Sequence, residues 1–389
     1  MNKKLNIGRV VTIGGAFIAF AIGSGFSTGQ EIMQFFAAYG TEIVLCAVVF
    51  FIGNLYMNYN FLEAGRKGQF EKGSQVFNYF GGKYIGLFFD WFSVIFSFAS
   101  YFVMIAGAGA TLQQQFGIQP VIGAVIIAAL AGLTVMLGLN KLVDIIGKIG
   151  PAIIVLCLLA GLVGIINGNL SFQEAEVLIP GSGIIAASGT WWGSMISYLG
   201  FGMLWFAPFL AAIGKEERNP KDAQYGTIMG VLVLTLAVLI VGSALIKNID
   251  LVGASQIPLL LILHQSSPFL ATVFSVVIFA GIYTTACPLL WTPVNRVAKE
   301  GTNTYKIAAI VLAAAGCVIG LVAPYAAIVN FIYAVNGKVG FLLVALVIIK
   351  NIRDAAARKN ACPLMFAICL PADLLPPAEG YTFAYPWRT

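Results

Sequence analysis

Two Gly-x-Gly motifs interrupt long apolar segments of this chain, Gly23-Ser24-Gly25 and Gly200-Phe201-Gly202. Glycine is a poor helix former, so each motif lets a helix unwind locally at low cost. Unwound backbone at membrane depth has unpaired N–H and C=O groups, which persist only where they line a buried or watery cavity. Two such motifs at corresponding places in the two halves of a chain therefore predict a central binding site. The alternative is that the glycines only allow helices to pack closely.

A break near residues 23–25 divides the first apolar segment into two half-helices. The outer one begins near Phe26, and its amino-terminal amides carry partial positive charge that attracts a carboxylate. The inner one ends near Ile22 and leaves the carbonyls of Ala19 and Ile22 unpaired. Such carbonyl oxygens suit a small, hard cation. The first segment thus predicts adjacent sites for an anionic group and for a cation.

Composition indicates an integral membrane protein. Of 389 residues, 59% are hydrophobic and 10% are charged, whereas a typical soluble domain is about 25% charged. The mean hydropathy is +0.91. A spanning helix needs roughly 20 apolar residues, and on that rule we expect ten spans. They cover about residues 10–38, 41–62, 84–112, 120–138, 142–167, 190–213, 223–246, 268–295, 304–323 and 325–349.

The basic residues predict the orientation of these spans. Lysines and arginines gather at one end of the spans, and Lys247 alone lies at the other end. Because cytoplasmic loops are enriched in Lys and Arg, both termini are predicted to be cytoplasmic. The same distribution explains the net charge of +6 without a nucleic-acid partner. We expect a multi-pass protein of the plasma membrane, embedded in the lipid bilayer.

Short motifs resemble a known group of transporters. Residues 199–202, LGFG, resemble the unwound segment of sodium-coupled amino-acid transporters with the LeuT fold, and residues 279–286 resemble that family's FAG-x-TSS-type stretch. Residues 148–151 are weakly similar to its fifth-helix pattern. The run GSGFSTGQE at 23–31 is similar to YkvI-type permeases of the amino acid–polyamine–organocation superfamily. The resemblance implies an all-α, polytopic LeuT fold in which ten transmembrane helices form a 5+5 inverted repeat, with helices 1 and 6 unwound.

This organisation divides the chain into four parts. The first five-helix repeat covers 8–167, and the second covers 190–350. An external connecting segment at 168–189 joins them, and a second external stretch at 250–267 is expected to contain a short helix over the outer vestibule. Residues 360–389 are proline-rich, which is unfavourable for regular helix, and are expected to be a cytoplasmic tail.

The resemblance implies a sodium site between the first and eighth spans. Its oxygens come from the carbonyls of Ala19 and Ile22 and the hydroxyls of Thr284 and Thr285. Oxygen ligands that bridge two helices suit a hard cation such as Na⁺. The alternative is that the two threonines hydrogen-bond back to their own helix.

The resemblance also implies a substrate pocket between the two unwound segments, with Tyr101 of the third span as a partner for a substrate carboxylate. The candidate residues are Ala21, Gly23, Gly25, Tyr101, Tyr198, Gly200, Phe201 and Gly202. Tyr101 has the alternative role of an aromatic side chain packed within the bundle. Because the set is apolar and aromatic, we expect a neutral, aliphatic or small zwitterionic substrate such as an amino acid.

Two ionisable residues depart from the family pattern. Gly29 replaces the arginine of the family's external gate, and Phe26 replaces an asparagine that serves a second sodium site. Instead, Glu31 lies two turns beyond the first break and Lys338 lies inside the tenth span. Ionisable groups at such depth are candidates for function. We interpret them as a gate or a proton-sensitive pair, with a purely structural ion pair, or a Lys338 that extends to the membrane edge, as the alternatives.

These features favour a secondary active transporter that couples Na⁺ entry to uptake of a small amino acid by alternating access. A proton-coupled amino-acid permease is the nearest variant, and a receptor that binds an amino acid without moving it is the alternative from another class. An enzyme is not expected, because the sequence has a single histidine and no Ser–His or His–carboxylate arrangement.

Overall fold

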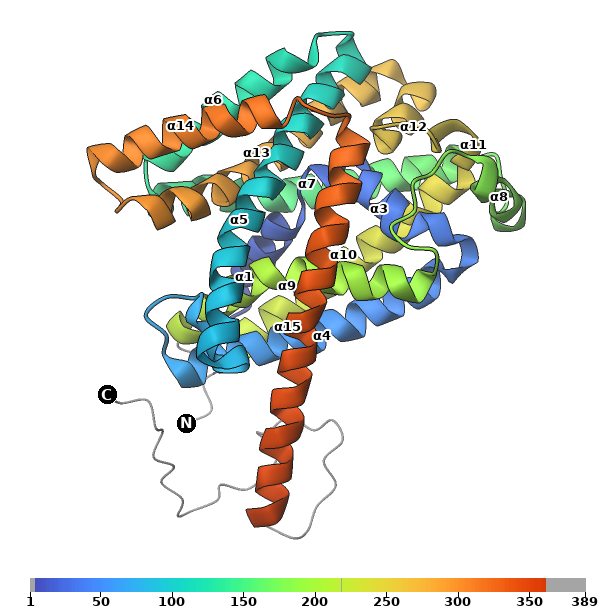
Figure 1. The fold of residues 1–389 in the computed structure, drawn as a ribbon. Coiled ribbons are helices and arrows are strands. Elements are labelled where there is room, and N and C mark those ends of the chain that lie inside the picture. The colour runs from blue at the N-terminus through green and yellow to red at the C-terminus, as the bar shows by residue number, and fades with distance from the viewer. Residues whose placement is uncertain (1–3, 218, 362–389) are drawn as a thin grey trace. The chain divides into compact units, whose positions relative to one another are not determined.

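The computed structural model describes residues 4–217 and 219–361, and every regular element within them is a helix (Figure 1). The first half contains α1 (Ile7–Ala21), α2 (Ser24–Thr28), α3 (Gln30–Phe35), η1 (Ala37–Glu42), α4 (Ile43–Gly68), α5 (Gln75–Phe116), α6 (Pro120–Met136), α7 (Leu139–Asn167), α8 (Phe172–Leu178) and η2 (Ile179–Gly181). The second half contains α9 (Trp191–Glu216), α10 (Pro220–Lys247), α11 (Ile249–Val252), α12 (Pro258–Ser266), α13 (Pro268–Val297), α14 (Asn303–Ile319) and α15 (Tyr325–Ala361).

Each of the ten predicted spans coincides with helical structure. By length and hydropathy, six helical segments among the described residues could cross a membrane alone, and a seventh could if the pair 152–167 and 172–181, bent by 94°, is one span. The six are Ala37–Gly68, Gln75–Phe116, Trp191–Glu216, Pro220–Lys247, Pro268–Val297 and Tyr325–Ala356. Three apolar helices, α1, α6 and α14, are shorter. The all-helical, multi-pass architecture is therefore established, whereas ten crossings stay a prediction.

Many large apolar side chains lie on the outside of these helices. On α4, for example, Val48 is 50% exposed and Ile52, one turn further, is 60% exposed. The opposite side of the same helix buries Cys46, Phe50 and Met57. A long helix that exposes one apolar face and buries another fits a bundle surrounded by hydrocarbon rather than by water.

The first span is interrupted at the place that its glycine motif indicates. α1 ends at Ala21, and Ile22 and Gly23 are extended, with φ/ψ of −87°/91° and −95°/−164°. α2 then begins at Ser24. A second turn, which the sequence analysis did not predict, follows at Gly29, where φ is +83°. Because side chains are strained in this left-handed region, glycine is favoured there, and the turn separates α2 from α3.

The predicted break in the sixth span is wrong. α9 is helical from Trp191 to Glu216, through Gly200, Phe201 and Gly202. Gly200 instead allows α9 to touch α15, since a Cβ built on it would lie 2.3 Å from the carbonyl oxygen of Gly337. A Cβ on Gly340 would in turn lie 1.9 Å from the carbonyl oxygen of Gly200. Here the close-packing alternative is correct, because small residues let two helix backbones approach.

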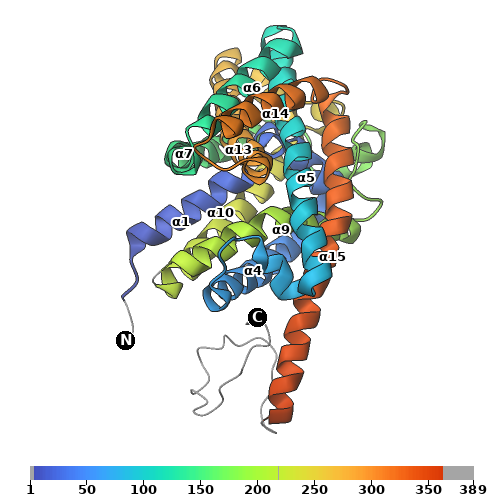
Figure 2. The same ribbon diagram turned by 60° about the vertical axis from the view of Figure 1, so that its left-hand side comes forward.

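Two compact units divide the chain, residues 1–347 and 348–389. Within the first unit, α4 packs along α9 and α1 packs along α10, and both views place α6 beside α14 (Figures 1 and 2). The inverted-repeat relation between residues 8–167 and 190–350 stays a prediction. Residues 360 and 361 end α15, and the predicted tail beyond them lies outside the described residues.

The two predicted external segments contain short helices. The connecting segment 168–189 holds α8 and η2, and Ser171 caps α8 by accepting a hydrogen bond from the amide of Glu174. The stretch 250–267 holds α12, a helix of nine residues. Leu259 of α12 lies against the turn at Gly29, 3.2 Å from a Cβ built there. Helix α12 therefore packs directly on the segment that contains the first break.

Candidate functional site

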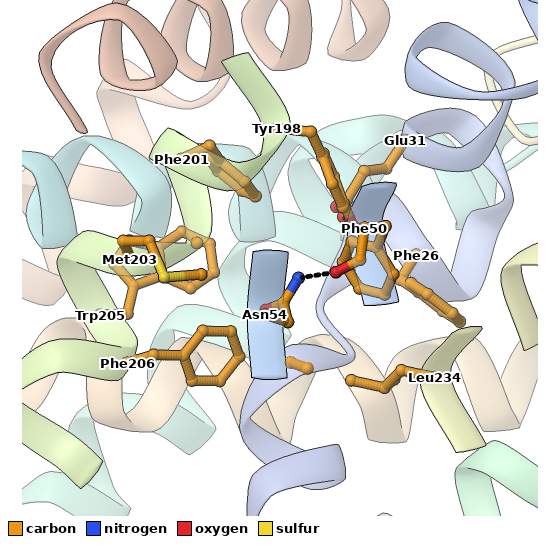
Figure 3. Close-up of a pocket in the computed structure, with 12 residues that line it drawn as sticks. Phe26, Glu31, Phe50, Asn54, Tyr198, Phe201, Met203, Trp205, Phe206 and Leu234 are labelled. Atoms are coloured by element: carbon orange, nitrogen blue, oxygen red, sulfur yellow. Dashed lines mark hydrogen bonds between the residues drawn. The ribbon is translucent and has the colours of Figure 1, made fainter. Parts of the chain in front are cut away.

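A small cavity lies beside the break in the first span (Figure 3). Its volume is about 30 Å³, which leaves room for little more than water. Its walls come from the end of α1 and from α2, α3, α4, α9 and α10. The lining residues are Ala21, Phe26, Glu31, Phe50, Asn54, Tyr198, Phe201, Gly202, Met203, Trp205, Phe206 and Leu234.

Aromatic rings form most of the wall. Phe201 lies edge-on to Trp205 with ring centroids 4.5 Å apart, and Phe50 lies 5.5 Å from Tyr198. Behind the wall, Phe201 packs against Tyr333 of α15 at 4.0 Å. Such pairs hold one another in defined orientations. The cavity is therefore an aromatic enclosure with preformed walls on the α9 side.

Glu31 contributes the one carboxyl group in this lining. The side chain is 3% exposed, and the hydroxyl of Tyr198 donates a hydrogen bond to its Oε1. Figure 3 shows the two side chains pointing toward each other. The Glu31 side chain also folds back over the first break, since a Cβ built on Gly25 would lie 2.5 Å from its Oε2.

The predicted pair of Glu31 and Lys338 is not formed. Among the described residues Glu31 makes no ion pair with a basic side chain, and Lys338 is exposed on α15. The pair fails because the turn at Gly29 directs α3, with Glu31, toward Tyr198 of α9. Glu31 was also not among the predicted pocket residues, yet its carboxyl group lines the cavity.

Few hydrogen-bond donors face the cavity. The amide nitrogen of Asn54 donates to the carbonyl of Phe50 at 2.9 Å, and the Tyr198 hydroxyl donates to Glu31. The indole Nε1 of Trp205, whose side chain is 7% exposed, has no hydrogen-bond partner among the described residues. In Figure 3 Trp205 and Phe206 lie on the opposite side of Asn54 from Glu31. The lining contains no Lys, Arg or His residue.

The inner side of the break brings together two of the predicted sodium ligands. The Thr285 hydroxyl of α13 donates to the carbonyl of Ile22 at 2.9 Å. The amide of Gly23 donates to the carbonyl of Ala21 at 3.2 Å, rather than to that of Ala19, which it would bind in a continuous helix. The Thr284 hydroxyl donates to the carbonyl of Gly281 in its own helix at 3.0 Å. Ile22 and Thr285 are therefore in direct contact, as the predicted sodium site requires. Thr284 instead hydrogen-bonds to its own helix, which was the alternative to a role as a ligand.

This oxygen set fits a hard monovalent cation. The Ile22 carbonyl, the Thr285 hydroxyl and the Ala19 carbonyl are neutral oxygen donors, which Na⁺ accepts. All three residues are buried, at 1%, 1% and 3% exposure. Within the part of the chain that the structure describes, no three His, Cys, Asp or Glu side chains group to hold a metal ion. The assignment of Na⁺ to Ala19, Ile22, Thr284 and Thr285 stays a prediction.

Tyr101 does not reach the cavity. It is completely buried, its hydroxyl has no hydrogen-bond partner within the described ranges, and its ring lies 2.3 Å from a Cβ built on Gly316 of α14. The residue of α5 that faces the break is Met104, whose Sδ lies 3.4 Å from the amide of Ser24. A thioether is a weak acceptor, so the first amide of α2 has only a poor partner. Tyr101 therefore has the packing role, which was its alternative.

The lining residues of α9 were predicted only as far as Gly202. Tyr198, Phe201, Gly202, Trp205 and Phe206 all line the cavity, and they recur at helical spacing along one face of α9. An unwound segment at 200–202 would have ended that face, so Trp205 and Phe206 were not candidates. The helical period of these residues was the signal that could have found them. Of the other candidates, Ala21 lines the cavity, whereas Gly23 and Gly200 do not.

The contact of Glu31 with Tyr198 gives a first prediction. We expect Tyr198→Phe to lower the free energy of unfolding by about 2 kcal/mol, because a buried carboxyl group loses its hydrogen bond. In a Gly25→Ala background the same change is expected to cost much less, because the new Cβ displaces the Glu31 carboxyl group from the position where Tyr198 meets it. Thermal or denaturant unfolding of the four proteins in detergent measures this coupling. Additive effects would contradict it.

Two curated proteins are similar in sequence. The uncharacterised protein YyaD of Bacillus subtilis is 24% identical over 278 residues, which cover 68% of this chain and 74% of YyaD. The uncharacterised membrane protein YkvI of the same organism is 21% identical over 347 residues, which cover 86% of this chain and 94% of YkvI. No protein-family model matches the chain.

Solved structures of transporters are similar in fold. MhsT in complex with L-phenylalanine is 16% identical, with a TM-score of 0.62 over 86% of this chain and 88% of MhsT. The substrate-bound, outward-open state of a Na⁺-coupled sialic acid symporter is 12% identical, with a TM-score of 0.60 over 87% of this chain and 78% of that one. The closed conformation of Mhp1 with bromovinylhydantoin is 14% identical, with a TM-score of 0.50. The chain therefore has the fold of LeuT-type transporters.

Proposed function

We propose that this chain is a secondary active transporter that couples Na⁺ entry to the uptake of a small solute with an amino group, an amino acid or a related amine. The observation that supports it is the interruption of the first span at Ile22 and Gly23, next to an aromatic cavity. A break of this kind supplies free carbonyls for an ion and sits where a cargo can be enclosed. The fold shared with Na⁺-coupled symporters supports the same class of function.

Alternating access needs a group of helices that moves as one body, and contacts at the inner end of α1 support such a group. The guanidinium of Arg9 binds the carboxylate of Glu217 at 2.6 Å. The amide of Asn6 donates to the carboxylate of Asp222 at 3.0 Å. These contacts connect the start of α1 to the end of α9 and to the first turn of α10, and α4 packs along α9. We infer that α1, α4, α9 and α10 rock together against the other helices.

The cavity also supports a closed state. A volume of about 30 Å³ cannot hold an amino acid or an amine. Because the walls are well-packed aromatic rings, entry of the cargo requires these helices to separate. In our proposal, binding of the cargo and Na⁺ at the break offsets the cost of the unpaired backbone and permits that motion.

Uptake into proteoliposomes tests the function. We expect an inward Na⁺ gradient to accumulate a labelled solute from a panel of L-phenylalanine, L-leucine and their decarboxylated amines, and replacement of Na⁺ by K⁺ to stop it. A solute should first be selected by its stabilisation of the purified protein against heat in NaCl. A protein that binds a solute tightly but never accumulates it would be a receptor, and the transport proposal would be wrong.

Proton coupling is the second candidate, and buried Glu31 favours it. A carboxyl group inside a membrane protein without a basic partner is costly to keep ionised, so it could take up a proton with the cargo. In that case uptake would follow an inward proton gradient and would persist when K⁺ replaces Na⁺. Substitution Glu31→Gln would then remove the response to pH and leave exchange of solute across the membrane.

Orientation belongs to the same proposal. We place the chain in the plasma membrane with both termini in the cytoplasm, because the basic residues gather at that end of the spans. Single cysteines introduced at exposed positions near Lys299 and near Glu174 should react with a membrane-impermeant reagent from opposite sides. Labelling of both from the same side would contradict this orientation.

A further inference from the structure

The cavity contains a carboxyl group where the sequence analysis had expected the cargo's own carboxylate. The amino-terminal end of α2 was predicted to attract an anionic group of the cargo. In the structure, Oε2 of Glu31 is 2.5 Å from a Cβ built on Gly25, the second residue of α2. The chain therefore supplies its own carboxyl group at the break. A cargo that binds in this cavity therefore needs no carboxyl group of its own.

The rest of the lining is poorly suited to a carboxylate. Such a group would lie close to Glu31 with no basic side chain in the lining to offset the charge, so the two carboxyl groups could not both be ionised in this site of low dielectric. The lining has no Lys, Arg or His residue. Of its polar side chains, Tyr198 donates its O–H to Glu31 and Asn54 donates one of its two amide N–H groups to Phe50, which leaves the second N–H of Asn54 and the indole N–H of Trp205 as donors. Neutral donors of this kind do not offset the desolvation of a carboxylate that lies beside a second carboxyl group.

The same lining is well suited to an organic cation. Glu31 gives the negative charge, and the rings of Phe50, Tyr198, Phe201 and Trp205 surround the space beside it. Aromatic faces attract ammonium groups through the ring quadrupole, and the attraction is strongest at desolvated sites. Glu31 and Tyr198 are 3% and 8% exposed, so both lie in such a site.

We propose that the cargo is an organic cation without a carboxylate, a primary or quaternary amine whose charged head binds between Glu31 and the aromatic rings of α4 and α9. This inference rests on the proposed function and narrows its class of cargo. Glu31 is then the residue that selects amines over amino acids. The Trp205 indole would donate to an uncharged acceptor on the far side of the cargo, such as a hydroxyl group.

Matched pairs of compounds test the proposal on the unaltered protein. The probes are 2-phenylethylamine against L-phenylalanine, 3-methylbutylamine against L-leucine, and choline. The two compounds in each pair differ only in the carboxylate. Binding to the full-length protein in detergent, in NaCl, is measured by calorimetry and by thermal stabilisation. We expect at least one amine to bind about tenfold or more tightly than its amino acid, which corresponds to about 1.4 kcal/mol.

A variant pair then identifies the residue responsible. We expect Glu31→Gln to weaken amine binding about tenfold or more, because the buried charge pair is lost. The amide oxygen that this substitution introduces can still accept the hydrogen bond from Tyr198, so the fold should persist. The control is Glu42→Gln, which removes an exposed carboxylate nearby and should leave binding unchanged.

Three outcomes would overturn the proposal: an amino acid that binds more tightly than its amine, no binding by any of the amines at millimolar concentration, or full amine binding by folded Glu31→Gln. These outcomes are separate from failure of the proposed function. An amine that binds through Glu31 but is never accumulated by a Na⁺ gradient would contradict transport and leave the class of ligand intact. Accumulation of an amino acid by a protein that binds no amine would contradict the proposed class of ligand and leave transport intact.

Discussion

Substitution Gly200→Ala is expected to destabilise the protein strongly, whereas Gly202→Ala, two residues away, is expected to be tolerated. A Cβ on Gly200 would lie 2.3 Å from the carbonyl oxygen of Gly337 and 2.5 Å from the amide nitrogen of Phe341. Backbone atoms cannot rotate away as a side chain can, so α9 and α15 must separate. Overpacking of this kind costs about 3 kcal/mol.

Gly202 is the matched control in the same motif. A Cβ there meets only the ring of Phe206, at 3.4 Å, which is ordinary contact. Because Gly202 lies inside a continuous helix, alanine should raise stability by up to about 1 kcal/mol. Thermal unfolding of both variants in detergent measures the difference. If the segment were unwound, alanine would be unfavourable at both positions, and equal losses of stability would contradict the continuous helix.

Removal of the Thr285 hydroxyl is expected to remove most of the response to Na⁺. That hydroxyl meets the Ile22 carbonyl at 2.9 Å, across the break from α1 to α13. In Thr285→Ala the cation would lose one oxygen ligand and the bridge between the two helices. We expect the Na⁺ concentration that gives half-maximal thermal stabilisation to rise about tenfold or more. Titration of NaCl against KCl at constant ionic strength measures it without any cargo.

Thr284→Ala is the control for this prediction. The Thr284 hydroxyl donates to the Gly281 carbonyl of its own helix at 3.0 Å, so its loss should change the response to Na⁺ much less. Both threonines are buried, so the two variants differ in the position of the hydroxyl and little in burial. Equal effects of both variants would favour the four-ligand site that the family resemblance implies. Unchanged Na⁺ stabilisation in Thr285→Ala would remove the site from the proposal.

The two Gly-x-Gly motifs look equivalent in the sequence, yet their backbone conformations differ in the structure. At Ile22 and Gly23 the helix is interrupted, and the Ile22 carbonyl accepts a hydrogen bond from Thr285 of another helix. At Gly200 the helix continues, and the missing side chain admits Gly337 and Gly340 of α15. A glycine motif lowers the cost of both arrangements. The neighbouring helix decides which arrangement forms, and its identity is not encoded within the motif.

The environment of Glu31 could likewise be predicted only in part from the sequence. Its burial and its importance follow from its place in an apolar span, because ionisable groups are rare there. Its partner was misassigned, since opposite charge favoured Lys338 while the turn at Gly29 directs the side chain to Tyr198. A tyrosine that donates to a carboxyl group has no signature in charge or spacing.

The sequence by itself determined the class of the protein: apolar runs of spanning length, basic residues gathered at one end of the spans, and a break in the first span are local properties of composition and helix propensity. Its short motifs also predicted the LeuT-type fold, and the similarity in fold to MhsT confirms that prediction. Only the tertiary structure decided that α9 is continuous, that Tyr101 packs against α14, and that Glu31 joins an aromatic enclosure. The physical reason is that backbone propensity depends on a few adjacent residues, whereas the environment of a side chain depends on segments that are far apart in the sequence.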